Sequence, residues 1–85
     1  MRRNMPSRSE LPGEISRKKF LNALRRLGFE INPIGGKGNH FKVTWPTTNK
    51  SVTVIGDLRN DVLYYLLKEI ELYSGITWEQ IKLEL

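Results

Sequence analysis

The stretch around the single histidine of the chain carries the residue types best suited to chemistry. Residues 35–45 read Gly-Gly-Lys-Gly-Asn-His-Phe-Lys-Val-Thr-Trp, so a glycine-rich turn leads into a run in which polar and apolar residues alternate. Successive side chains of a strand point to opposite faces, which predicts that His40, Lys42 and Thr44 share one face while three apolar residues form the other. One face is therefore expected to be core, and the other an exposed row of a base, a cation and a hydroxyl.

These residue types are suited to the cleavage of RNA. An RNA chain supplies its own nucleophile, the 2′-hydroxyl, and a histidine titrates in the range where it can take or return a proton there. His40 would be that group, Lys42 would offset charge that develops on the phosphate, and Lys37 in the turn would hold a neighbouring phosphate. The alternative is that His40 is an ordinary surface residue and that the glycines only form a hairpin turn. The glycines are not a P-loop or dinucleotide motif, because no helical pattern follows them.

The composition excludes several kinds of site. The chain has no cysteine and one histidine, which removes disulfides, thiolate chemistry and cysteine-ligated zinc. No clustered acidic motif suggests a magnesium site. We therefore expect no metal and no cofactor.

The charge distribution favours an acidic partner. The chain carries a net charge of +5, with eight basic against three acidic residues in positions 1–30 and three basic against six acidic in positions 57–85. A basic surface over the first two-thirds favours nucleic acid, with a solvated charge face as the alternative. No segment approaches the roughly 18 apolar residues of a membrane span, and the N-terminus lacks the apolar stretch of a signal peptide. We expect no membrane partner and a cytoplasmic location.

The first helix is predicted to run from an N-cap at Ser16 to Leu27, with Gly28 ending it. Its apolar residues recur at helical spacing and leave basic residues on the remaining surface. Lys19 and Arg26 on that surface are candidate RNA contacts. A cation near the C-terminal end of a helix also suits the helix dipole, so Arg26 has a structural explanation as well.

Three strands and two helices complete the domain. Strands are predicted at residues 29–34, 40–45 and 51–55 as an antiparallel meander. A second helix is predicted to begin with Asn60 as N-cap and to end at Gly75, with an apolar surface wider than one stripe, and residues 77–80 match a capping box that begins a short last helix. The fold class is therefore α+β, in the order αβββα plus a short C-terminal helix, with the helices over one face of a three-stranded antiparallel sheet. Residues 15–85 form this single domain, and residues 1–14 are predicted to be a flexible basic arm, either a frayed terminus or a contact for phosphates.

This order of elements, with its particular residues, resembles the HicA-type toxins of toxin–antitoxin systems. The resemblance covers roughly residues 15–81. The segments that carry it are Leu24-Arg25-Arg26-Leu27-Gly28-Phe29, Gly36-Lys37-Gly38-Asn39-His40, Val52-Thr53-Val54, Leu66-Leu67-Lys68 and Gly75-Ile76-Thr77-Trp78-Glu79-Gln80. Asn39 stands where the family has a small hydroxyl residue.

The resemblance implies a double-stranded-RNA-binding-domain-like fold, a metal-independent endoribonuclease activity on messenger RNA, and a HicB-type antitoxin that covers the active face. The histidine of the family maps onto His40. Two other hypotheses remain open at this point. The chain could be a non-catalytic RNA-binding or inactivated toxin-like module, or a small protein-interaction domain that uses the apolar second helix. Self-association also remains open, because a domain of 85 residues can bury only a small core.

Overall fold

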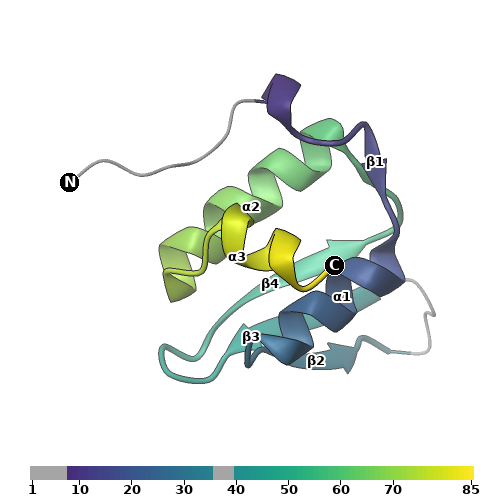
Figure 1. The fold of residues 1–85 in the computed structure, drawn as a ribbon. Coiled ribbons are helices and arrows are strands. Elements are labelled where there is room, and N and C mark those ends of the chain that lie inside the picture. The colour runs from purple at the N-terminus through teal and green to yellow at the C-terminus, as the bar shows by residue number, and fades with distance from the viewer. Residues whose placement is uncertain (1–7, 36–39) are drawn as a thin grey trace.

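The computed structural model describes residues 8–35 and 40–85, and within them it confirms the α+β architecture (Figure 1). A three-stranded antiparallel sheet has the order β2-β3-β4, and two longer helices and one short helix pack on it. The main elements are α1 (Arg17–Arg26), β2 (Glu30–Pro33), β3 (His40–Trp45), β4 (Lys50–Ile55), α2 (Asn60–Ser74) and α3 (Trp78–Leu83). None of the helices in this part of the chain is long and apolar enough to cross a membrane.

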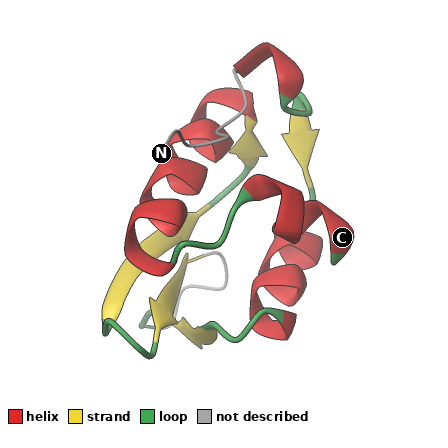
Figure 2. Cartoon of the chain, turned by 60° about the vertical axis from the view of Figure 1, so that its left-hand side comes forward, coloured by secondary structure: helices red, strands yellow, loops and turns green. Residues whose placement is uncertain are grey.

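The sheet is covered on one face. Val43 on β3 and Val52 and Val54 on β4 are buried, whereas Lys42 and Thr53, which alternate with them, are exposed. The buried valines belong to one core cluster with apolar residues of α1, α2 and α3. All three helices therefore lie on the same side of the sheet, as predicted, and α3 lies between α1 and α2 (Figure 2).

Helix α1 forms as its sequence predicts. The Oγ of Ser16 accepts a hydrogen bond from the backbone N–H of Lys19 at 3.4 Å, which caps the first turn. Gly28 has φ of 109°, a left-handed conformation that favours glycine, and the N–H of Phe29 then donates to the carbonyl of Leu24 at 3.0 Å. Phe29 is thereby buried beneath the helix that it follows.

Helix α2 ends as predicted but begins differently. Gly75 ends it with φ of 80°, and its N–H donates to the carbonyl of Glu71. The prediction that Asn60 is the N-cap is wrong: Arg59 occupies the cap position, and its side chain makes no cap hydrogen bond. The side chain of Asn60 instead donates through Nδ2 to the carbonyl of Leu11 at 3.4 Å. Asn60 therefore binds a segment far away in the sequence.

That distant segment is residues 8–15, most of which the sequence assigns to a flexible arm. Here it comprises the short 3₁₀ turn η1 (Arg8–Glu10) and strand β1 (Glu14–Ile15), which pairs antiparallel with β5 (Leu58–Arg59). Leu11 is only 6% exposed, and the N–H of Asn60 donates to the carbonyl of Gly13 at 3.0 Å. Residues 8–15 are therefore packed against the domain, while the rest of the predicted arm, residues 1–7, lies outside the described residues.

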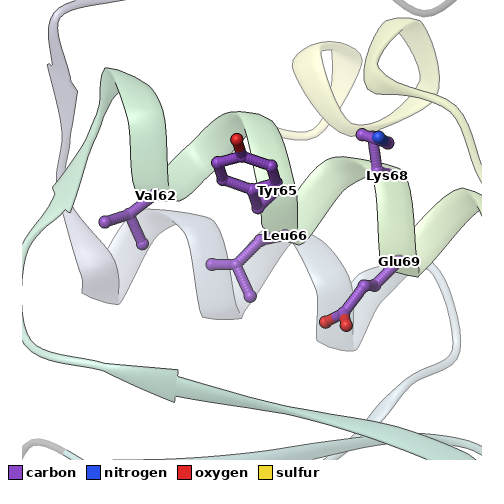
Figure 3. A pocket seen from close by; sticks show the side chains of 5 residues that line it. All are labelled: Val62, Tyr65, Leu66, Lys68 and Glu69. Atoms are coloured by element: carbon purple, nitrogen blue, oxygen red, sulfur yellow. The ribbon is translucent and has the colours of Figure 1, made fainter.

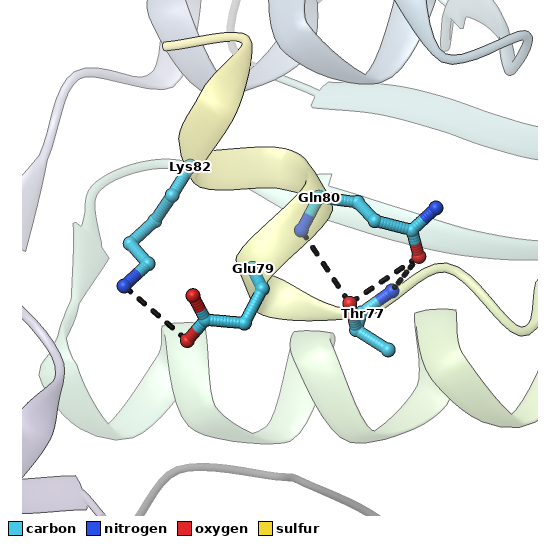
Figure 4. Close-up of polar contacts among 4 residues, drawn as sticks. All are labelled: Thr77, Glu79, Gln80 and Lys82. Carbon is cyan, nitrogen blue, oxygen red and sulfur yellow. Dashed lines mark hydrogen bonds and ion pairs between the residues drawn. The ribbon is translucent and has the colours of Figure 1, made fainter.

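The capping box at the start of α3 is confirmed (Figure 4). The backbone N–H of Gln80 donates to Oγ1 of Thr77 at 3.4 Å, and the N–H of Thr77 donates to Oε1 of Gln80 at 2.9 Å. Trp78 and Ile81 of this helix are buried. The Glu79–Lys82 ion pair on its outer side is exposed and contributes little to stability.

The packing of residues 8–15 leads to a prediction about stability. Replacing Leu11 by Ala should lower the free energy of unfolding by about 2 kcal/mol, because it removes a buried side chain and leaves a cavity. Urea denaturation measures the loss. Leu83 is 85% exposed, so Leu83→Ala is the matched control and should change stability by less than about 0.5 kcal/mol. A Leu11→Ala protein as stable as the parent would show that this segment does not contribute to the fold.

Candidate active site on the open face of the sheet

The face of the sheet that the helices leave uncovered, here called the open face, is mostly polar. Its members follow from the strand register, since residues paired directly across an antiparallel sheet point to the same side. The N–H of Ile34 donates to the carbonyl of His40 at 3.0 Å, which extends the β2–β3 pairing beyond Pro33. The open face comprises Glu30, Asn32, Ile34, His40, Lys42, Thr44, Ser51, Thr53 and Ile55.

His40 is held at one end of this face by backbone pairing on both sides. It is the first residue of β3, it is paired with Ile55 on β4, and its carbonyl accepts the hydrogen bond from Ile34. The histidine itself is half-buried, and Ile55 beside it is 51% exposed. The imidazole therefore lies between two isoleucines on an otherwise polar face, within reach of solvent.

Lys42 lies on the same face, about 7 Å further along the strand. It is exposed, and the register pairs it with Asn32 on β2 and with Thr53 on β4. A base and a cation at this spacing can address a proton and a charged oxygen of one phosphodiester linkage. The predicted row of His40, Lys42 and Thr44 therefore lies on the open face. Its polar neighbours, such as Asn32, were not predicted, although the register of the hairpin would have identified them.

The other predicted RNA contacts are not part of this face. Lys19 and Arg26 are exposed on α1, which packs on the covered side of the sheet. Arg26 also donates through Nη1 to the carbonyl of Glu84 at 2.8 Å, so it has a structural role at the end of the chain. Lys37 lies outside the described residues. Of the predicted site residues that the structure describes, His40 and Lys42 share the open face, whereas Lys19 and Arg26 do not.

Arg17 ties α1 to the end of the sheet at which His40 stands, a role that no sequence pattern indicates. Its Nη1 donates to the carbonyl of Gly56 at 3.1 Å, and its guanidinium lies 5.9 Å from the centroid of the Phe41 ring. Gly56 follows Ile55, the partner of His40, and Phe41 follows His40 itself. The half-buried arginine therefore contacts a backbone carbonyl just after β4 and a side chain on β3, both next to the histidine.

A pocket on α2 differs from the open face in the residues that line it (Figure 3). It measures about 490 Å³ and is lined by Val62, Tyr65, Leu66, Lys68 and Glu69. Lys68 places its Nζ 5.8 Å from the ring of Tyr64 and 6.0 Å from that of Tyr65, and Leu72 further along is 64% exposed. The wide apolar surface predicted for this helix is present, and its lining suits a contact with another molecule rather than proton transfer.

Among residues 8–35 and 40–85, no three His, Asp or Glu side chains lie close enough together to hold a metal ion.

No family model, no curated protein and no solved structure matches the chain. The features that bear on its function are therefore the open face, the charge distribution and the motif resemblance.

The contacts of Arg17 with Gly56 and Phe41 can be tested by their contribution to stability. Arg17→Met keeps an unbranched stem but removes the hydrogen bond to Gly56 and the cation above Phe41, so we expect the free energy of unfolding to fall by about 1 kcal/mol. Lys19→Met is the matched control. It removes a cation from the same turn of α1, but Lys19 is exposed on the outside of the helix. Equal stability of the two variants in thermal denaturation would show that the contacts of Arg17 with Gly56 and Phe41 do not stabilise the fold.

Proposed function

We propose that this protein is a HicA-like endoribonuclease that cleaves messenger RNA with His40 as its general base. The observation that carries the proposal is the position of His40 and Lys42 on one uncovered sheet face. The net charge of +5 and the HicA-like motifs support it. As a toxin that acts on messenger RNA it would work in the cytoplasm, and its HicB-type antitoxin would cover the open face.

The proposed reaction uses the RNA, this chain and a proton from solvent. His40 takes the proton of a 2′-hydroxyl, and the 2′-oxygen attacks the adjacent phosphorus. The bond from phosphorus to the 5′-oxygen of the next nucleotide breaks, and that oxygen takes a proton from solvent. The products are a 2′,3′-cyclic phosphate and a 5′-hydroxyl. Lys42 offsets the charge on the phosphate oxygens as the new bond forms.

A second function, RNA binding without cleavage, is favoured by a different observation. The first turn of α1 consists of Arg17, Lys18 and Lys19, which offers cations to phosphates on the covered side of the sheet, opposite the open face. Binding of this kind would weaken steeply with salt and would survive the loss of His40. The two functions are therefore separated by one substitution.

Purified protein should cleave single-stranded RNA, and His40→Ala should lower kcat about 10²- to 10⁴-fold, because it removes the group that transfers the proton. Gel electrophoresis of a labelled RNA measures the rate. Lys50→Ala, which removes an exposed cation at the opposite end of β4, is the control and should leave kcat unchanged. RNA with a 2′-deoxy nucleotide at the cleaved position should remain intact, and a chelator should have no effect. Equal cleavage by His40→Ala, or cleavage only with added divalent metal, would refute the proposal.

Expression in bacterial cells should arrest growth if the protein is a toxin. Colony counts after induction measure the arrest, and His40→Ala should restore growth at the same level of protein. Co-expression of a small reading frame encoded next to this one tests for the antitoxin. Arrest by His40→Ala as strong as that by the parent would show that the toxicity, if any, does not come from this histidine.

A further inference from the structure

A groove on the flank of α1, here called the α1 groove, lies near the His40 end of the sheet. It measures about 300 Å³ and is lined by Arg17, Lys18, Leu21, Asn22, Arg25 and Phe41. Its described lining contains three cations and no acidic residue. The wall is therefore positive, and Leu21 and Phe41 supply an apolar floor.

The polar groups of the groove are oriented by contacts of their own. Arg25 donates through Nη1 to Oδ1 of Asn22 at 2.8 Å, and Arg17 is held by the Gly56 carbonyl and the Phe41 ring. A guanidinium has five N–H donors in a fixed plane, so each arginine keeps donors for a ligand after making these bonds. Oriented guanidinium groups favour ligands with several acceptor oxygens, such as phosphates.

The placement of cations along α1 is difficult to explain by folding. A helix N-terminus carries partial positive charge, so acidic residues stabilise the first turn and basic residues destabilise it. The first turn of α1 has no acidic residue and begins with Arg17, Lys18 and Lys19. Arg25 in the last turn suits the dipole, but Lys18 opposes it. A residue type that lowers the stability of its own helix is typical of a functional site.

The groove is also close to His40 along the chain. Phe41 on its floor is the next residue after His40, and the two side chains point to opposite faces of β3. A nucleic-acid strand with one phosphate at His40 therefore has to cross from one side of the sheet to the other to reach the groove.

We propose that the α1 groove binds phosphates of single-stranded RNA next to the nucleotide that is cleaved at His40, with Lys18 and Arg25 as the contacting cations. This inference rests on the proposed function for the identity of the cleaved nucleotide, but the groove itself can be tested without cleavage.

The experiment measures RNA binding in His40→Ala protein, which keeps the RNA intact. Fluorescence anisotropy with a labelled single strand of about 12 nucleotides, long enough to span one small domain, gives the affinity between 50 and 200 mM salt. Each phosphate contact to a single strand contributes about 0.7 to the slope of log affinity against log salt. The further substitutions Lys18→Ala and Arg25→Ala together should therefore reduce the slope by about 1.4.

The control is the pair Lys50→Ala and Lys82→Ala, which removes the same charge from exposed positions outside the groove. Its slope should equal that of the His40→Ala parent. Equal slopes for the groove variant and the parent, an equal loss in the control, or no RNA binding at all would each overturn the proposal. A duplex of the same sequence that loses as much slope as the single strand would overturn the single-stranded assignment.

The outcomes also separate this inference from the proposed function. If protein with an intact His40 cleaves RNA while the groove variant keeps the full slope, the groove proposal fails and the ribonuclease proposal stands. If the groove variant loses slope while protein with an intact His40 cleaves no RNA, the groove stands as a binding site and the ribonuclease proposal fails.

Discussion

The one-sided burial of β3 is the constraint on which the rest of the structure depends. Val43 is 1% exposed and packs in the same cluster as Phe20 and Leu24 of α1. Because side chains alternate along a strand, burying Val43 forces His40 and Lys42 to the opposite face. A shift of the register by one residue would bury the cation and expose the core residues. The same strand thus places polar residues on the open face and apolar residues in the core. A change in the register of β3 would alter both at once.

Two contacts at opposite ends of α1 hold the helix over this strand. At the far end, the centroids of the Phe29 and Trp45 rings lie 4.7 Å apart, and Gly28 lies beside Trp45, where an added Cβ would be in ordinary van der Waals contact at 3.5 Å from the indole. At the His40 end, Arg17 binds the Gly56 carbonyl. The first contact is apolar and belongs to the core. The second is polar and leaves most of the guanidinium donors of Arg17 available to an anion.

Features encoded by neighbouring residues were predictable, and features encoded by distant ones were not. The alternation of β3, the Ser16 cap and the capping box at Thr77 depend on residues within a few positions of one another, and each is confirmed. The β1–β5 pair is two residues long on each strand and joins segments far apart, so no periodicity marks it. Asn60 has the right residue type for a cap, yet its side chain binds the Leu11 carbonyl, because tertiary contacts can override a local preference. For the site, the sequence indicates the face on which His40 and Lys42 stand. It does not indicate which flank of α1 borders the groove, and the groove contains Lys18 and Arg25 rather than the predicted Lys19 and Arg26.

The arrangement of the two candidate surfaces restricts the form of RNA that could use both. His40 and Phe41 are adjacent in the chain but point to opposite faces of β3, so the open face and the α1 groove lie on opposite sides of the sheet. An A-form duplex is recognised across its wide, shallow minor groove and would lie along a single surface of a domain this small. A single strand can bend at each linkage and follow a path from one face to the other. If both surfaces bind the same molecule, the fold itself selects unpaired RNA. The selection of unpaired RNA would then follow from the alternation of side chains along β3 rather than from contacts with the bases.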